Sequence, residues 1–236
     1  MSKINLNEYK SIVFDLDGVI YDINDAIQKA VDDIIEKYNL QVNKNNIMEE
    51  IAELIEKLQY KPVPKSILDS YNLLQLEFLK GLSYFKKLRI GLFLLSQFNK
   101  YREDSGIFEG IEDVIKKLAE KELNLAILTN NKSDYAEEIL EKFNLTRYFA
   151  KIIGFNDLTN VKPDPEGLLK IIKDWNVEPE ETIFIGDMQT DIKAGKAAGT
   201  TVICVASGLA EKSTLLKEEP DYLVDSTAEL KALLGF

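Results

Sequence analysis

The chain has 236 residues, of which 45% are hydrophobic and 29% are charged, so it can bury a full core and is too apolar for a disordered protein. Its net charge of -11 argues against nucleic acid and anionic lipid as partners. One cysteine, Cys204, and no histidine exclude an intramolecular disulfide and a multi-cysteine zinc site, and leave carboxylates, lysine or hydroxyls for any catalysis.

Short apolar runs recur along the chain with helical patterns between them. Runs of this kind are typical of parallel strands that are buried on both faces. In chain order they are SIVF at 11–14, LNLAILT at 123–129, AKIIGF at 150–155, TIFIG at 182–186, TTVICVA at 200–206 and a weaker YLV at 222–224.

Helical spacing fills the gaps between these strands from residue 107 onward. The expected helices cover about 110–121, 132–143, 164–175 and 188–198, and STAELKALL forms a final helical segment. Strands that alternate with helices in this way predict an α/β fold, a doubly wound parallel sheet of the Rossmann-like type.

The segment after the first strand departs from this alternation. Between residue 22 and residue 104 the patterns are helical and no strand pattern intervenes. We therefore expect an α/β core of residues 1–21 and 105–236, with a smaller all-helical domain, 22–104, inserted after the first strand. The helical stretches are NDAIQKAVDDIIEKYNL, NNIMEEIAELIEKL, KSILDSYNLLQLEFLKGL and LRIGLFLLSQFNKY, with a break at KPVP, an exit at YDIN and a return linker at YREDSG.

Polar residues follow the expected strands at their carboxyl ends. In an open α/β sheet this edge is where ligands bind. The residues are Asp15 and Asp17 after the first strand, Thr129 and Asn130 after the second, Lys162 in the loop after the third, and Asp187 with Asp191 after the fourth.

Two acid pairs at this edge predict a metal site. Asp15 and Asp17 are two positions apart, so both carboxylates can point the same way if the strand continues through them. Asp187 and Asp191 could complete the site, since Asp191 lies one turn into a helix. Hard oxygen ligands of this kind suit Mg2+ together with substrate phosphate oxygens.

The four segments FDLDGV, ILTN, VKPDP and GDMQTD resemble the ordered motifs of the haloacid dehalogenase (HAD) superfamily. The helical insert resembles the C1-type cap domain of that superfamily, and the resemblance extends from Ile12 to about Val205. VKPDPEGL and GDMQTDIKAGKAAGT are similar to its phosphoglycolate phosphatase-like group. The resemblance implies a HAD-type phosphatase, a phosphoric monoester hydrolase that acts on small phosphorylated metabolites.

The resemblance also implies a role for each residue. Asp15 would attack phosphorus and form an aspartyl phosphate, and Asp17 would act as general acid and then as general base. Thr129 and the backbone N–H of Asn130 would bind phosphate oxygens. Lys162 would offset the charge of the nucleophile and the phosphoryl group, as catalytic and phosphate-binding residue at once.

The same resemblance implies that a Mg2+ ion would bind Asp15, the carbonyl of Asp17 and Asp187. Asp191 would support the metal directly or through water.

Three alternatives stay open. The first is a mutase of the β-phosphoglucomutase-like branch, because Val19 stands where many phosphatases of the superfamily have threonine and that branch also fits this motif. These mutases use a cap histidine, which this chain lacks. A phosphoacceptor signalling protein of the receiver type would be about half as long and without the insert. A catalytically silent relative would lack catalytic positions that are filled here.

Location and assembly are less constrained by the sequence. The segment MSKINLNEYK has no apolar signal region, and no run approaches the about 18 apolar residues of a membrane span. We expect a cytoplasmic protein without a membrane partner, a monomer or a homodimer.

Overall fold

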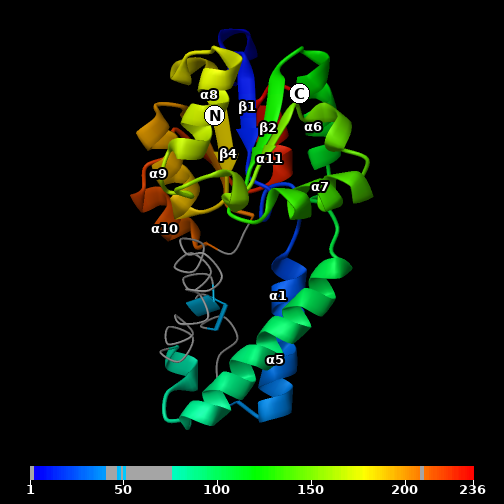
Figure 1. Ribbon diagram of the computed structural model, residues 1–236, viewed down its shortest axis with the longest axis vertical. Coiled ribbons are helices and arrows are strands. Elements are labelled where there is room, and N and C mark those ends of the chain that lie inside the picture. Colours follow the sequence, from blue (N-terminus) through cyan, green and yellow to red (C-terminus); the bar gives the residue numbers. More distant parts are fainter. Residues whose placement is uncertain (1–2, 41–46, 49, 52–75, 208–209) are drawn as a thin grey trace. The chain divides into compact units, whose positions relative to one another are not determined.

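The computed structural model describes residues 3–40, 47–48, 50–51, 76–207 and 210–236 (Figure 1). The chain divides into two compact units. The first comprises Met1–Asp22 and Ile107–Phe236, and the second comprises Ile23–Gly106. Within the described ranges, no helix combines the length and the apolar character that crossing a membrane requires.

The first unit is built on a parallel sheet of six strands in the order β3-β2-β1-β4-β5-β6. The strand order reverses at β1, which pairs with β2 on one side and with β4 on the other. This confirms the predicted doubly wound sheet. The strands are β1 (Ser11–Phe14), β2 (Asn124–Leu128), β3 (Lys151–Ile153), β4 (Thr182–Gly186), β5 (Thr201–Val205) and β6 (Tyr222–Val224).

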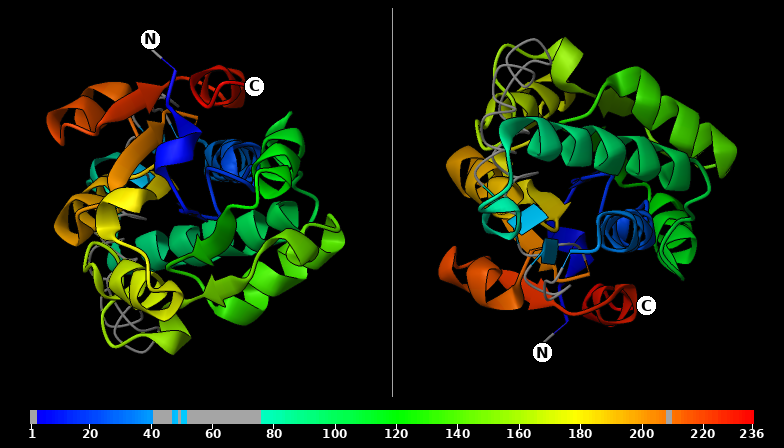
Figure 2. Two further views of the ribbon diagram at one scale, coloured as in Figure 1. Left: turned by 90° about the horizontal axis from the view of Figure 1, so that it is seen from above. Right: turned by 90° about the horizontal axis from the view of Figure 1, so that it is seen from below.

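Helices cover both faces of this sheet. In Figure 2, α6 and α11 lie on the face opposite to α8 and α9, as right-handed crossovers on either side of a reversal point require. The short helix α10 has no counterpart in the prediction, because its single turn and a half buries only Leu215 and carries no helical period. The helices of this unit are α6 (Ile111–Glu120), α7 (Ser133–Lys142), α8 (Glu166–Trp175), α9 (Gln189–Ala198), α10 (Lys212–Lys217) and α11 (Thr227–Leu233).

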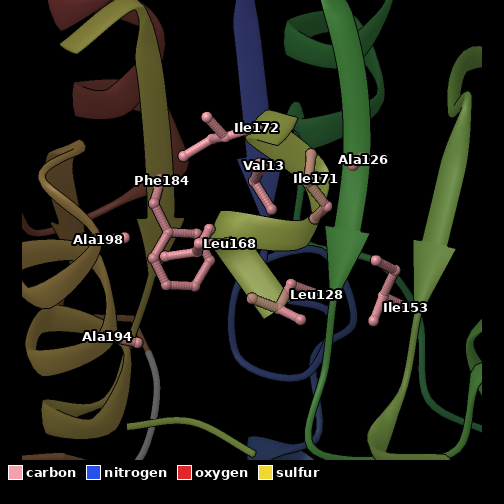
Figure 3. Packing of buried hydrophobic residues seen from close by; sticks show 10 residues of the cluster. All are labelled: Val13, Ala126, Leu128, Ile153, Leu168, Ile171, Ile172, Phe184, Ala194 and Ala198. Atoms are coloured by element: carbon pink, nitrogen blue, oxygen red, sulfur yellow. The ribbon is translucent and has the colours of Figure 1, made fainter. Parts of the chain in front are cut away.

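One hydrophobic cluster shows how α8 and α9 pack on the sheet (Figure 3). The α8 side chains Leu168, Ile171 and Ile172 recur at helical spacing, so they form one apolar stripe, and they are buried. Burying a side chain of this size contributes about 1.5–3 kcal/mol. From the strands and α9, the cluster adds Val13, Ala126, Leu128, Ile153, Phe184, Ala194 and Ala198.

The described part of the second unit is helical. It contains α1 (Asn24–Tyr38), the 3-10 turn η2 (Glu77–Leu79) and α5 (Tyr84–Glu103), together with helical residues at 47–48 and 50–51. The hydroxyl of Tyr38 donates to the carbonyl of Arg89 at 3.3 Å, and that of Tyr101 donates to Asp33 at 2.8 Å. The two contacts make α1 and α5 antiparallel neighbours.

The expected return linker at YREDSG is partly wrong. Residues Tyr101 to Glu103 belong to α5, and the helix ends only at Glu103. The polar composition of this stretch suggested a loop, but the hydrogen bond of Tyr101 to Asp33 on α1 keeps the last turn packed. The break expected at KPVP lies outside the described residues.

Candidate active site

The carboxyl ends of the central strands place the predicted residues at one edge of the sheet. The N–H of Asp15 donates to the carbonyl of Ile185 at 2.8 Å, so the β1–β4 pairing continues into Asp15. The N–H of Thr129 donates to Ile153 at 3.0 Å and extends β2 in the same way. Asp187 follows the last residue of β4 directly. Adjacent parallel strands therefore deliver Asp15 and Asp187 side by side.

Three carboxylates form a buried cluster at this edge. Asp15, Asp187 and Asp191 each offer an oxygen, and these oxygens lie within 4.8 Å of one another. Burial raises the pKa of Asp15 to about 7, with the nearby Asp191 adding to the effect and Lys162 opposing it. Burial, with Asp191 and Asp15 close by, also raises the pKa of Asp187 well above its ordinary value.

Lys162 places a cation inside this cluster. Its Nζ lies 2.9 Å from Oδ1 of Asp15 and 2.6 Å from Oδ1 of Asp191, and the side chain is only 2% exposed. Burial by itself would lower the pKa of Lys162, but the two carboxylates outweigh it and hold the pKa above its ordinary value. Lys162 is therefore a fixed positive charge beside Asp15.

Both oxygens of Asp191 are already engaged. Oδ1 accepts from the ammonium of Lys162, and Oδ2 accepts from the N–H groups of Asp187 at 3.1 Å and Met188 at 3.0 Å. The two hydrogen bonds from the backbone N–H groups cap the start of α9, where an acidic side chain is favoured. Asp191 thus fixes both the cation and the loop that carries Asp187.

Asn130 supports Lys162 through its side chain. Its amide nitrogen donates to the carbonyl of Lys162 and its amide oxygen accepts from the N–H of Lys162, both at 3.1 Å. The sequence predicted a contact through the backbone of Asn130 and missed this one. Thr129 is buried, and its Oγ1 accepts from the N–H of Asn131 at 3.1 Å. Its hydroxyl group lies at the carboxyl end of the extended β2 strand.

Asp17 is not a member of the carboxylate cluster formed by the described residues. One of its oxygens, Oδ2, accepts from the side-chain amide of Asn131, and Oδ1 accepts from the hydroxyl of Tyr135 at 3.2 Å. Neither Asn131 nor Tyr135 was singled out from the sequence. The position of Asn131 directly after the recognised residues Thr129 and Asn130 was the one sequence signal that could have indicated its role. No sequence signal indicated Tyr135, because the helical pattern of α7 does not tell which of its residues faces the end of β1.

Gly18 permits the close approach of β1 and the loop after β4. Its φ of +83 is in the left-handed region, and a Cβ at this position would overlap the carboxylate of Asp187. The carbonyl of Gly18 accepts from the hydroxyl of Ser207 at 3.0 Å. A side chain on residue 18 would therefore displace a member of the acid cluster.

The acid cluster fits a hard divalent cation. The oxygen Oδ1 of Asp187 is buried without a hydrogen-bond partner among the described residues, and an unsatisfied buried carboxylate oxygen is costly unless a cation binds it. Carboxylate oxygens are the donors that Mg2+ prefers. Asp15 and Asp187 would be the residues that hold such an ion, and Asp191 accepts hydrogen bonds from the N–H groups of Asp187 and Met188.

The fold and the site define an α/β protein with a buried acid and lysine centre at the carboxyl edge of a parallel sheet. The family model of the haloacid dehalogenase-like hydrolases matches residues 12–205. The chain belongs to this family, as the motifs predict.

Similar proteins with curated names are phosphoglycolate phosphatases. One from Salmonella choleraesuis is 27% identical over 255 residues, covering 98% of this chain and 94% of that protein. One from Salmonella typhi is 32% identical over 143 residues, and there the alignment covers 58% of this chain and just over half, 57%, of that protein. Together with the family match, these relatives support a phosphatase enzyme.

Solved structures share the fold. A predicted phosphoglycolate phosphatase from Haemophilus somnus aligns with a TM-score of 0.71 at 21% identity, over 96% of this chain and 98% of that one. At this level of identity the likeness establishes the fold alone.

Proposed function

We propose that the protein is a Mg2+-dependent phosphatase that hydrolyses a small phosphorylated metabolite, a phosphoglycolate-like phosphate monoester, through an aspartyl-phosphate intermediate. One observation carries the proposal: the ammonium of Lys162 lies 2.9 Å from a buried oxygen of Asp15. A carboxylate that is fixed beside a permanent cation can approach an anionic phosphoryl group, whose charge would otherwise repel it.

In the first step, an oxygen of Asp15 attacks phosphorus. The bond between phosphorus and the ester oxygen breaks, and the leaving oxygen takes a proton from the carboxyl group of Asp17. The products are a free alcohol and a phosphoryl group bound to Asp15. Thr129 and the N–H of Asn130 hold phosphate oxygens during this transfer, and Lys162 balances the charge.

In the second step, water attacks the same phosphorus atom. The ionised Asp17 takes a proton from the water, the bond between phosphorus and Asp15 breaks, and inorganic phosphate leaves. Asp15 returns as a carboxylate and Asp17 is protonated again, so the cycle closes.

The metal site of this proposal consists of Asp15, the carbonyl of Asp17 and Asp187, supported by Asp191. A bound Mg2+ would supply positive charge that offsets the carboxylates and the phosphate oxygens. The support for this is the buried oxygen Oδ1 of Asp187, which has no hydrogen-bond partner in the part of the chain that the structure describes.

The relatives named phosphoglycolate phosphatase support the proposed substrate class. The negative charge of the chain would hinder an anionic substrate, and the ammonium of Lys162 supplies local positive charge at the site. We propose that the helical unit acts as the cap, which excludes water and reads the leaving group. The cytoplasmic location and the choice between monomer and homodimer stay predictions.

A phosphatase screen tests the proposal. Phosphate release from a panel of small phosphate esters is measured with Mg2+ and with EDTA, for the wild type, Asp15→Asn and the control Asp174→Asn, which changes an exposed acid on α8. We expect activity in the wild type and the control, and its loss with EDTA or in Asp15→Asn. Equal release from wild type and Asp15→Asn would contradict the proposed mechanism.

The intermediate can be tested directly. In Asp17→Asn the second step lacks its base, so a reactive aryl phosphate should load Asp15 faster than water removes the phosphoryl group. Intact-protein mass spectrometry should then show a gain of one phosphoryl group, located at Asp15 by peptide mapping. An unmodified protein that still releases phosphate would argue against the covalent path.

Val19 keeps a sugar-phosphate mutase as the second candidate. The same screen separates the two, because a mutase converts β-glucose 1-phosphate into glucose 6-phosphate, whereas a phosphatase releases inorganic phosphate from it.

A further inference from the structure

The carboxylate of Asp17 is held at both of its oxygens by side chains outside the four recognised motifs. The amide of Asn131 donates to Oδ2, and the hydroxyl of Tyr135 donates to Oδ1 at 3.2 Å. Donors on both oxygens fix the rotation of the carboxylate plane as well as its position. A single donor would leave that plane free to turn.

Both donors are themselves anchored. The N–H of Asn131 donates to Oγ1 of Thr129 at 3.1 Å, and its carbonyl accepts from the N–H of Phe155 at 2.9 Å. The start of α7, which carries Tyr135 in its first turn, is tied by Asn156, whose side chain bonds the N–H and the hydroxyl of Ser133 at 2.9 and 2.8 Å. The side chains around Asp17 are therefore held by the loop after β2, the start of α7 and the segment after β3.

We propose that Asn131 and Tyr135 are positioning residues that aim the carboxyl group of Asp17 at the leaving oxygen of the substrate. The inference rests on the proposed function, in which Asp17 transfers the proton. Each carboxylate oxygen has two lone pairs, so a donor on one of them leaves a second position on the same oxygen. Asn131 and Tyr135 can therefore hold Asp17 while the proton passes between that second position and the leaving oxygen of the substrate.

The leaving group of the substrate provides a selective readout. An alkyl phosphate needs a proton on its departing oxygen, whereas p-nitrophenolate departs without one. A misaimed Asp17 should therefore slow the alkyl ester and spare the aryl ester, because general acid catalysis contributes about 100- to 10,000-fold where it is needed. A general loss of structure would slow both esters alike.

The experiment compares kcat/KM for glycerol 3-phosphate and for p-nitrophenyl phosphate, with Mg2+ present. The ratio kcat/KM depends only on the steps up to and including the first irreversible one. It therefore reports departure of the leaving group and not the later hydrolysis of the aspartyl phosphate. The proteins are wild type, Tyr135→Phe, Asn131→Ala, Asp17→Asn and the control Tyr148→Phe, whose hydroxyl accepts a hydrogen bond from the exposed neighbour Arg147 at 3.0 Å. Thermal unfolding of each variant shows that it is folded.

We expect Tyr135→Phe and Asn131→Ala to lower the alkyl-to-aryl ratio of kcat/KM by about 10-fold each, a part of the general acid contribution. Asp17→Asn should lower the ratio further, and Tyr148→Phe should leave it unchanged. The positioning role is overturned if the ratio stays at the wild-type value in both variants while Asp17→Asn lowers it. If the wild type hydrolyses neither ester, or Asp15→Asn hydrolyses both at the wild-type rate, the proposed function fails and the inference fails with it.

Discussion

Lys162 and Asp191 form a buried ion pair in which the ammonium lies 2.6 Å from a carboxylate oxygen. The two side chains are 2% and 0% exposed. A pair at this depth cannot exchange its partner for water, so each member depends on the other. The pair also links the loop after β3 to the start of α9, since the second oxygen of Asp191 accepts from the N–H groups of Asp187 and Met188.

Asp191→Asn should destabilise the protein and lower its activity. The amide of asparagine has one acceptor oxygen, so it can accept either from the ammonium of Lys162 or from the backbone N–H groups. Its NH2 group then faces the other set of donors, which it cannot bind. Removing one partner of a buried pair costs about 3–5 kcal/mol. Urea unfolding measures the change, and Asp174→Asn, in the exposed pair with Lys151, should change little. Equal effects of the two substitutions would contradict this account of the pair.

The stability of the metal-free protein should fall as pH rises through the range from about 4 to about 7. Burial raises the pKa of Asp15 from 3.8 to about 7, so between these values the folded state keeps a proton that the unfolded state has lost. Asp187, whose pKa burial also raises, adds to the slope. Urea unfolding in EDTA across this range measures it.

Asp187→Asn should flatten this pH dependence and raise the stability of the metal-free protein at pH values above 7. The substitution removes a buried carboxylate and its repulsion of Asp15. A slope unchanged from wild type would show that Asp187 does not contribute to it.

Mg2+ should raise the unfolding temperature of the wild type. An ion that binds only the folded state adds about 2.7 kcal/mol when it is present at 100 times its dissociation constant. In Asp187→Asn this increase should be lost or much reduced, while Asp174→Asn should keep it. Differential scanning calorimetry with Mg2+ and with EDTA measures the effect. A full increase in Asp187→Asn would place the cation elsewhere.

Gly18→Ala should reduce activity more than backbone strain alone explains. The φ of residue 18 is +83, and the added Cβ would overlap the carboxylate of Asp187. Gly81 is a matched control, because its φ is +81 and no atom of the described residues lies within 4 Å of the position of its Cβ. Left-handed strain of about 1–2 kcal/mol is common to both substitutions. The comparison of Gly18→Ala with Gly81→Ala, by urea unfolding and by phosphatase assay, therefore isolates the crowding of Asp187.

The strands were predictable because each is a short buried run between polar segments. β1 and β4 have the predicted bounds, and the other four strands lie within or match the predicted runs. The proximity of Asp15 to Asp187 followed in turn, since parallel strands bring their carboxyl ends to one edge. α5 was predicted to begin at residue 88 but begins at Tyr84. Its basic first turn FKK hid the start from a search for apolar periodicity.

The side-chain contacts within the site were not predictable in this way. Two examples are the hydrogen bonds of the Asn130 side chain to the backbone of Lys162 and of the Tyr135 hydroxyl to Asp17. Both depend on how a loop and a helix are oriented against the sheet. Periodicity gives the face of a helix that is buried, but not which polar atom at its rim meets which strand end. The full use of both oxygens of Asp191 likewise needs the three-dimensional structure.

The position of β1 in the sheet has a consequence for biosynthesis. Ser11 pairs with Asn124 on one side and with Thr182 on the other, so β1 is translated long before either of its neighbours exists. Its apolar side chains and backbone edges therefore stay unpaired by β2 and β4 until the helical unit, β2, β3 and β4 have been translated in turn. A chain stalled before β4 would expose one edge of β1 and would lack Asp187 and Asp191. Such a fragment would therefore be prone to aggregate and unable to form the acid centre.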